Sequence, residues 1–269
     1  MKVSLLMATY ERPDALGAVL ASVLRQSDAP DEVIIADDGS GPATRTVIER
    51  FSASAPMRTL HVRHEHDGFR VCRIRNLGIA LATGDYIVQV DGDMVLHERF
   101  IADHRAAARR GCFVQGTRIL ADADLTRALL DCKPHVITPW TPGIGRLRRL
   151  YAAHLPPLAG ACAWIANSFI AVKGCNQGFW RQDLLRVNGY NEAMTGWGSE
   201  DKELALRLTH AGVRRRTLLF AGIAYHLQHP IAARDRHSIN ETILARTRRE
   251  RLVRCRCGLA EARTGASML

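Results

Sequence analysis

The chain has 269 residues, of which 47% are hydrophobic and 24% are charged, and its formal net charge is +10. This composition is ordinary for a globular protein and excludes a wholly disordered, collagen-like or low-complexity chain. No stretch approaches the roughly 18 apolar residues needed to cross a membrane as a helix. The amino terminus lacks the basic, apolar and small-residue segments of a signal peptide, so we expect a cytoplasmic protein.

The positive charge, nearly all of it arginine, favours an anionic partner, although arginine excess can also reflect genomic base composition. Six arginines crowd one carboxyl-terminal segment: Arg246, Arg248, Arg249, Arg251, Arg254 and Arg256. The seven cysteines are scattered, which is typical of reduced core residues and not of a disulfide framework. Cys255 and Cys257 lack the second pair that a structural zinc site needs.

Strand-like and helix-like segments alternate over the first 120 residues. We expect strands at 3–8, 32–37, 58–63 and 86–90, and helices at 13–26, 44–51, 73–82 and 98–109. This alternation predicts an α/β fold with a mostly parallel central sheet flanked by helices. In such sheets ligands bind beyond the carboxyl ends of the strands, where polar residues cluster in this chain.

The second half of the chain is less regular. Several prolines and glycines between Lys133 and Gly160 predict a mobile loop with a short helix near 147–154. Further along we expect an edge strand at 176–180, helices at 181–187 and 200–211, strands at 217–220 and 224–226, and a basic helix from about Ser238.

Asp91, Gly92 and Asp93 directly follow an apolar strand. Two carboxylates separated by one small residue can share one hard cation, and the glycine lets the backbone turn so that both face it. A divalent cation held in this way would bridge the two phosphates of a nucleotide. We therefore assign Asp91 and Gly92 to a nucleotide site and Asp91 and Asp93 to a metal. The alternative is a solvated Asp-Gly turn.

Two other strand ends supply candidate nucleotide contacts. Asp38 can accept a hydrogen bond from a uracil N3–H or a ribose hydroxyl, although an Asx turn that opens a helix explains this residue equally well. Tyr10 can stack on a base and Thr9 can hydrogen-bond to it. Glu11 and Arg12 complete that cluster at the end of the first strand, so we place them at the same site.

Arg75 and His226 each have a functional and a structural interpretation. The guanidinium of Arg75 can neutralise phosphate or hold the base, or it can lie on a solvated helix face. His226 ends a predicted strand and can be a third ligand of the Asp91 and Asp93 metal, but a lone histidine is more often structural. We expect His229 to be structural or to contact the acceptor.

Trp197 lies between Gly196 and Gly198, and Glu200 and Asp201 follow closely. Two glycines are poor helix and strand formers, so this tryptophan is free to offer its face to a sugar ring. The two acids fall in the first turn of the next helix, where the helix dipole stabilises negative charge and a carboxylate can act as a base. The alternative is an ordinary helix cap with Ser199 at the N-cap, which leaves Trp197 unexplained.

With these residues in place the chain resembles glycosyltransferase family 2 in its GT-A fold, over roughly residues 3–230. The runs VSLLMATYERPDAL, EVIIADDGS and IRNLGIALATGDYIVQVDGD follow the amino-terminal half of that family in order and spacing. The run NQGFWRQDLLRVNGYNEAMTGWGSEDKELALRL resembles the subgroup shared with the amino-terminal domain of chondroitin polymerase and with galactosyltransferase-type carboxyl-terminal segments.

The resemblance implies a role for each matching residue. Asp91 and Asp93 match the Asp-x-Asp element, with Asp93 the more direct ligand of Mn²⁺ or Mg²⁺, and His226 matches the histidine that completes the metal site. Asp201 matches the catalytic base, and Glu200 matches its neighbour in catalysis and acceptor binding. The positions that match nucleotide contacts are Thr9, Tyr10, Asp38, Arg75 and Asn76.

The family further implies an inverting, metal-dependent transfer of a hexose from a UDP-sugar to a hydroxyl of a glycan or lipid-linked glycan, in bacterial surface polysaccharide synthesis. Residues 1–120 would form the nucleotide-sugar-binding half of one GT-A domain, 121–230 its acceptor-binding and catalytic half, and 231–269 a basic helical tail. Because the chain ends soon after one such domain, we expect a single transfer and not two-sugar polymerisation.

Other functions compete with this one. The basic tail can dock on an anionic membrane surface at the inner face of the cell membrane, or be a solvated helix. A nucleic-acid partner is not expected, because no recognition module or aromatic platform is found. A catalytically silent sugar-nucleotide or glycan binder of the same fold is opposed by the intact Asp91, Asp93 and Asp201. A nucleotidyltransferase would have no use for the Trp197 element.

Overall fold

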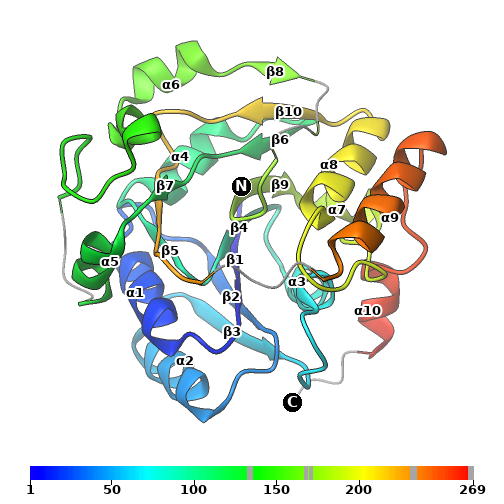
Figure 1. The fold of residues 1–269 in the computed structure, drawn as a ribbon, viewed down its shortest axis with the longest axis horizontal. Helices are drawn as coiled ribbons and strands as arrows, with labels where there is room; N and C mark the ends of the chain where they lie inside the picture. The colour runs from blue at the N-terminus through cyan, green and yellow to red at the C-terminus, as the bar shows by residue number, and fades with distance from the viewer. Residues whose placement is uncertain (132–135, 167–168, 170–171, 231–234, 266–269) are drawn as a thin grey trace.

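Four parallel strands form one half of a central eight-stranded sheet, as the alternating pattern predicts (Figure 1). In spatial order they are β3 (Arg58–Arg63), β2 (Glu32–Asp37), β1 (Val3–Thr9) and β4 (Tyr86–Asp91). The computed structural model describes residues 1–131, 136–166, 169, 172–230 and 235–265. Because the four strands are parallel, their carboxyl ends and the polar clusters after them share one edge of the sheet.

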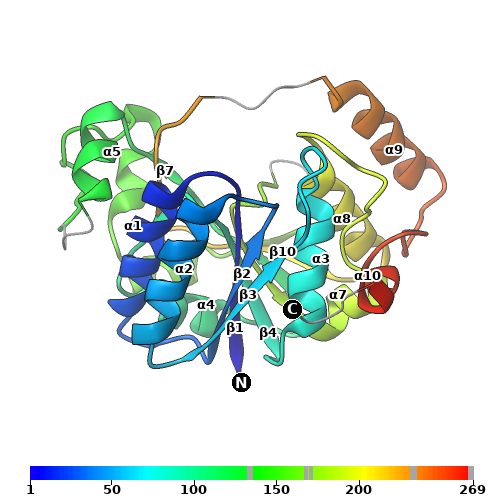
Figure 2. The ribbon, with the colours of Figure 1, turned by 90° about the horizontal axis from the view of Figure 1, so that it is seen from below.

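Helices cover both faces of this sheet (Figure 2). α1 and α2 lie on one face, and α3, α7 (Arg181–Val187) and α8 (Glu200–His210) lie on the other. Successive side chains of a strand point to opposite faces, and β1 feeds both cores in this way. Leu5 and Met7 pack in the core beneath α1 and α2, whereas Leu6 packs with Ile34 in the core beneath α3. The helices of this half are α1 (Pro13–Leu24), α2 (Pro42–Ser54), α3 (Val71–Leu81) and α4 (Phe100–Ala107).

The other half of the sheet is mixed and runs in the order β9 (Asn176–Trp180), β6 (Cys112–Gln115), β10 (Arg214–Thr217) and β8 (Ile165–Ala166). The bounds predicted for β9 are right, but its prediction as an edge strand is wrong. It lies between β4 and β6, antiparallel to both, and all five of its residues are buried. Its polar residues suggested an edge, yet the buried Asn176 amide donates to two backbone carbonyls, those of Thr117 and Gly222.

Two other predictions in this half are corrected. The strand expected at 217–220 lies earlier, since β10 runs from Arg214 to Thr217. Its first three residues are arginines, and such a run is not typical of a strand in the sequence. The short helix near 147–154 is confirmed as a 3₁₀ helix at Arg146–Ala152, but the loop expected up to Gly160 is interrupted by α6 (Pro156–Cys162). Proline favours the first turn of a helix, where its missing N–H costs nothing. Residues 132–135 of the predicted loop lie outside the described residues.

A small second sheet joins distant segments in the order β5 (Met94–Leu96), β11 (Ala224–His226) and β7 (Ile119–Leu120). In its register His226 lies opposite Met94, the residue after Asp93. The small sheet therefore brings the predicted histidine to the predicted metal-binding carboxylate. The remaining helices before the carboxyl terminus are α5 (Ala123–Leu130), α7 (Arg181–Val187) and α8 (Glu200–His210).

The carboxyl-terminal segment folds back onto the domain. Its basic helix, predicted from about Ser238, is α9 (His237–Arg249), which packs along α8, and α10 (Leu259–Gly265) packs against α3 (Figures 1 and 2). Leu244 of α9 and Leu259 of α10 are buried. Within the described residues, no helix has the length and apolar character required to cross a membrane.

Candidate active site

The acidic residues predicted at the strand ends and the first turn of α8 meet at one edge of the sheet. Asp91 ends β4, and the β4–β9 register pairs Val90 with Asn176, so the start of β9 lies beside Asp91. Just before that start, the Gly174 backbone N–H donates to Asp201 Oδ2 at 2.6 Å. Two carboxylates far apart in the sequence are thereby held a short distance from one another.

Arg75 joins these two groups of acids. Its Nη2 donates to Asp91 Oδ1 at 2.8 Å, and its Nη1 lies 3.8 Å from Glu200 Oε1. The residue is only 3% exposed, so the interpretation of Arg75 as part of a solvated helix face is wrong. Burial alone would lower the pKa of this guanidinium, but the ring of Tyr190, Asp91 and Glu200 together raise it. Arg75 is therefore a fixed cation between the acids.

Asp93 forms a compact cluster with two histidines and an arginine. Its Oδ2 lies 3.1 Å from His229 Nε2, 3.8 Å from His226 Nε2 and 3.5 Å from Arg12 Nη1. The small sheet positions His226, and His229 follows three residues later. His229, expected from the sequence to be structural or an acceptor contact, thus lies beside the predicted metal ligand.

The residues at Asp93 fit a divalent metal ion. One ligand atom from each of Asp93, His226 and His229 lies within 4.8 Å of the others, and Asp93 Oδ1 is buried without a hydrogen-bond partner. A buried carboxylate oxygen left unpaired is costly unless something binds it. One carboxylate with two imidazoles suits a transition-metal ion better than Mg²⁺, which prefers oxygen ligands. Asp91, predicted to share the ion, turns to Arg75.

The charge states of Asp93 and His226 agree with metal binding, whereas the hydrogen bond to Asp93 raises the pKa of His229, which must lose its proton to bind a metal. Burial raises the pKa of Asp93, but His229, His226 and Arg12 outweigh it and lower the pKa overall. Burial lowers the pKa of His226. An ionised carboxylate beside a neutral imidazole is the form in which both residues bind metals.

The first turn of α8 is reached through backbone that favours glycine. Gly196 and Gly198 have φ of 73° and 116°, and a Cβ on Gly198 would lie 2.8 Å from His237 Cδ2. Ser199 occupies the N-cap position as the alternative predicted, but its hydroxyl donates to Glu241 of α9 and caps nothing. The turn is therefore shaped by close packing against α9, and Glu200 and Asp201 begin α8.

Burial raises the pKa of both acids in this turn. For Glu200, burial, the neighbouring Asp201 and Asp91 raise the pKa to about 7, against the opposing effect of Arg75. For Asp201, burial raises the pKa, while Arg75 and the N–H groups of Gly174 and Lys202 limit the rise. Carboxylates with raised pKa are suited to proton transfer near neutral pH.

Asp38 is held by the segment after β3. Its Oδ1 lies 2.5 Å from His64 Nε2, and its Oδ2 accepts from the Arg70 N–H at 3.0 Å. Its neighbour Asp37 accepts from the Ser40 N–H at 2.8 Å, which is the turn that the alternative interpretation predicted. Asp38 therefore lies at the expected edge with both oxygens already engaged.

The residues after β1 point in different directions. Tyr10 is 41% exposed, and one face of its ring is stacked on His66 with the centroids 4.5 Å apart. The Glu11 carboxylate turns away and accepts from the Gly41 N–H at 2.8 Å, at the start of α2. Of these two, Tyr10 offers a surface to a ligand and Glu11 holds a helix terminus.

Thr9 and Gly92 touch, whereas Asn76 faces elsewhere. A Cβ on Gly92 would lie 2.9 Å from Thr9 Oγ1, so only glycine fits there. The Asn76 amide is buried and exchanges hydrogen bonds with the Tyr190 backbone, and it also donates to Glu192 at 2.9 Å. These contacts connect α3 to the segment before Trp197 and direct the Asn76 side chain away from the metal cluster.

Trp197 is presented at the surface beside α9. Its ring is stacked on His237 with centroids 6.0 Å apart, and 37% of the residue is exposed. The Asn240 side chain holds the loop by donating to the carbonyls of Thr195 and Gly198. The aromatic face predicted to meet a sugar is thus held by the carboxyl-terminal segment.

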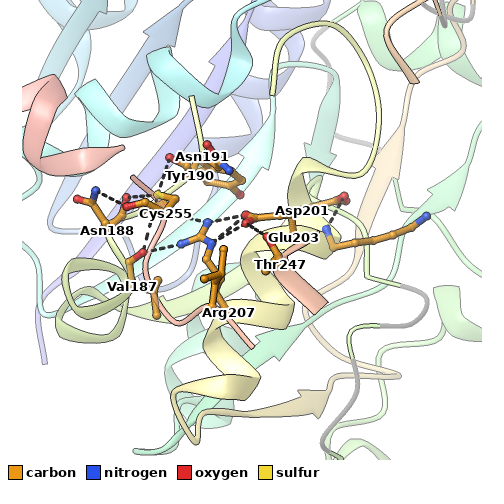
Figure 3. Close-up of polar contacts among 12 residues, drawn as sticks. Val187, Asn188, Tyr190, Asn191, Asp201, Glu203, Arg207, Thr247 and Cys255 are labelled. Atoms are coloured by element: carbon orange, nitrogen blue, oxygen red, sulfur yellow. Dashed lines mark hydrogen bonds and ion pairs between the residues drawn. The ribbon is translucent and has the colours of Figure 1, made fainter. Parts of the chain in front are cut away.

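A buried polar network supports α8 from behind, as Figure 3 shows. Arg207 is fully buried and donates three hydrogen bonds to the Glu203 carboxylate, and it also donates to the Gly189 carbonyl at 2.8 Å. Thr247 of α9 donates to Glu203 Oε1 at 2.9 Å. Nearby, the Cys255 thiol lies 3.3 Å from the Asn188 carbonyl. The helix that carries Glu200 and Asp201 is thereby fixed to both α7 and the carboxyl-terminal segment.

Comparisons with known proteins agree with this architecture. A profile of the family described as "Glycosyl transferase family 2" matches residues 4–170, which is more than half of the chain. The chain belongs to glycosyl transferase family 2. A second profile, described as "N-terminal domain of galactosyltransferase", matches residues 165–230. Both parts of the predicted resemblance are confirmed, and the fold is the predicted GT-A fold.

Two chondroitin synthases are among the similar proteins. The one from Pasteurella multocida is 24% identical over 85% of this chain and 25% of its own length. That from Escherichia coli is 26% identical over 85% of this chain and 35% of its own length. The validoxylamine A glucosyltransferase of Streptomyces hygroscopicus subsp. limoneus is 27% identical over 78% of this chain and 48% of its own. This family 2 chain therefore spans half or less of these relatives.

Two solved structures show the same fold at low sequence identity. S. aureus TarS 1-349 has a TM-score of 0.64 and 12% identity, over 97% of this chain and 68% of TarS 1-349. The mannosyltransferase PcManGT from Pyrobaculum calidifontis, in complex with GDP-Man and Mn²⁺, has a TM-score of 0.59 and 18% identity, over 94% and 61%.

Proposed function

We propose that this glycosyltransferase transfers a sugar from a UDP-sugar to a hydroxyl of a glycan or lipid-linked glycan, with inversion at the anomeric carbon, in bacterial surface polysaccharide synthesis. The observation that carries the proposal is Arg75, which contacts Asp91 at 2.8 Å on one side and lies 3.8 Å from Glu200 on the other. The sheet edge proposed to bind the donor and the two carboxylates proposed to act on the acceptor therefore lie at the same site. The resemblance to TarS, solved with UDP and with UDP-GlcNAc, supports the uridine donor.

Asp201 acts as the general base in this proposal. It takes the proton of the acceptor hydroxyl as that oxygen forms a bond to the anomeric carbon of the donor. The bond from the anomeric carbon to the diphosphate breaks, and its electron pair leaves with UDP. General base catalysis contributes about 10²–10⁴-fold in rate. Glu200, one residue earlier and paired with Arg75, positions the acceptor.

A divalent ion would be held by Asp93, His226 and His229, with Asp91 close by. When bound, it neutralises negative charge on the departing diphosphate. The two imidazoles favour Mn²⁺ over Mg²⁺ in this proposal. Arg12, 3.5 Å from Asp93, adds a further positive charge at the same place.

The remaining contacts of the proposal are those that the family resemblance implies, and of these residues Tyr10 and Trp197 are exposed. The free face of Tyr10 stacks on the base and Thr9 hydrogen-bonds to the donor. Asp38 receives the uracil or ribose, which then competes with His64 for its Oδ1. Trp197 packs on a sugar ring of the acceptor.

A donor panel tests the function. The protein is incubated with UDP-, GDP- and TDP-sugars and Mn²⁺, and release of the nucleoside diphosphate is measured with and without simple glycan acceptors. We expect release from at least one UDP-sugar, including slow hydrolysis without acceptor. Binding of UDP-sugars with no release from any of them would support the silent binder and contradict the proposal.

The carboxyl-terminal arginines suggest where the enzyme works. Arg246, Arg248 and Arg249 lie on the exposed side of α9, while Leu244 and Thr247 on its other side are buried. We propose that this exposed side contacts an anionic membrane surface that carries the acceptor, at the cytoplasmic face of the membrane.

A further inference from the structure

Arg118 lies near the site, but no sequence motif and no step of the proposed mechanism gives it a role. It lies between β6 and β7, in a loop whose Gly116 N–H donates to the Asn176 carbonyl at 3.0 Å. The Asn176 side chain in turn donates to the Thr117 carbonyl at 2.7 Å. These bonds attach the loop to the start of β9, at the edge of the sheet where Asp91 ends β4.

The surroundings of Arg118 place it beside the metal cluster. Arg118 directly precedes β7, whose Ile119 and Leu120 pair with Tyr225 and His226 of β11. Burial raises the pKa of the thiol of Cys175, the residue before β9, and the charge of Arg118 opposes that rise. Arg118 is therefore close both to a proposed metal ligand and to the residue that precedes β9.

Arg118 differs from the other two arginines of the site. Arg75 and Arg12 both have carboxylate partners, at 2.8 Å and 3.5 Å. Arg118 is half-buried and, among the residues that the structure describes, no carboxylate lies within ion-pair distance of it. Its Nε is buried without a hydrogen-bond partner, and so is the hydroxyl of Thr117. A buried charge without a partner is expensive, which is the property of a side chain prepared for a ligand.

We propose that Arg118, assisted by the Thr117 hydroxyl, binds the diphosphate of the nucleotide donor beside the metal ion. A guanidinium matches phosphate oxygens with paired N–H donors, and a half-buried one is worth more than a solvated one. The proposal rests on the proposed function, since it names a binding residue for the same donor. Arg118 and Arg12 then both supply positive charge to the departing diphosphate.

Isothermal titration with UDP and with uridine, in the presence of Mn²⁺, tests this assignment without relying on turnover. In Arg118→Gln we expect the affinity for UDP to fall about tenfold or more, since a charged hydrogen bond is lost, while the affinity for uridine is unchanged. Arg118→Lys should recover part of the loss, because it restores the charge without the paired donors. Arg109→Gln is the matched control, an exposed arginine before the amino end of β6, and it should bind UDP like the wild type.

The outcomes separate this inference from the proposed function. If the wild-type protein binds UDP and Arg118→Gln binds it equally well, Arg118 does not contact the diphosphate. If UDP affinity is unchanged but the KM for an acceptor rises, Arg118 binds an anionic group of the acceptor, and its assignment to the donor diphosphate is wrong. A wild-type protein that binds no UDP would instead contradict the proposed function. Thermal unfolding of each variant shows that the fold is retained.

Discussion

The donor side and the acceptor side of this site meet at Arg75, but the chain builds them by different means. On the donor side, Thr9 and Asp91 end two parallel strands and Asp38 follows the strand beside β1, and the register of the sheet places them together. On the acceptor side, Glu200 and Asp201 begin a helix that is held from behind by a buried network reaching from α9.

The difference separates local from distant determinants of function. The strand ends of the donor side depend on residues close to those strands, such as Gly92, which fits only because it has no side chain. Its metal cluster is the exception, because Asp93 meets His226 and His229 from a distant segment. The acceptor side depends on residues 40 or more positions away, as in the contact of Thr247 with Glu203. The carboxyl-terminal segment is therefore part of the folded domain that carries the site.

Replacing Asp93 should break the donor side most severely. We expect Asp93→Ala to lose the metal-dependent part of UDP affinity, because the cluster loses its only carboxylate while two histidines remain. Replacing a residue that only hydrogen-bonds to a metal ligand lowers metal affinity about 10–100-fold, so replacing a direct ligand should lower it at least as much. Titration of UDP with and without Mn²⁺ measures the effect. Asp124→Asn, on an exposed part of α5, serves as the control, and a metal response equal to wild type in Asp93→Ala would refute the site.

Breaking the buried network should destabilise the acceptor side. Arg207→Met leaves Glu203 buried without its cation, which costs about 3–5 kcal/mol. Urea unfolding should show this loss, while Arg246→Met, at an exposed position on α9, should stay within about 0.5 kcal/mol of wild type. The double replacement Glu203→Leu with Arg207→Met should recover much of the loss. A small effect of Arg207→Met alone would mean that α8 is held by apolar packing.

The raised pKa of Glu200 predicts a pH-dependent contribution of this residue to stability. Its pKa is raised to about 7 from an ordinary 4.5, so the folded protein keeps a proton that the unfolded chain has lost between these values. The folded state binds more protons there, and this residue makes stability fall as pH rises from about 4.5 to 7. Glu200→Gln should remove that component, which paired unfolding curves at pH 5 and pH 7.5 would reveal. Identical pH dependence in the two proteins would count against the raised pKa.

The smallest expected effect concerns the outer face of α9. Each arginine near an anionic surface contributes about 1 kcal/mol to membrane attraction. Co-sedimentation with phosphatidylglycerol vesicles should weaken in Arg246→Gln with Arg249→Gln, and unchanged sedimentation would remove the docking hypothesis. Charge variants are preferable to deletion of the tail, because deletion would also remove the buried Thr247 and Leu259.

The sequence predicted the donor side well because its signals are local. A short apolar run followed by acidic residues marks β2 and β4 and their ends, and the predicted bounds of β2, β3 and β9 agree with the structure. The position of β9 in the sheet was missed, because burial of Asn176 depends on partners that are distant in the sequence.

The site itself was predicted in part. Asp201, Glu200, Arg75 and Asp91 are brought together as the motifs suggested. His229 was missed as a partner of Asp93, although its spacing from His226 was the available signal. Glu11 and Asn76 are engaged in contacts within the fold that no periodicity could reveal. No sequence motif indicates Arg118. What distinguishes it is that its Nε is buried without a hydrogen-bond partner among the described residues, which only the structure shows.

The central claim is that Asp201, held by the Gly174 N–H beside Arg75, is the base of a sugar transfer. Single-turnover measurement of UDP release by Asp201→Asn, with the donor that the panel identifies and with acceptor present, tests it most directly. We expect a fall in rate of about 10²–10⁴-fold while UDP affinity stays at the wild-type value. Wild-type turnover by this variant would contradict it.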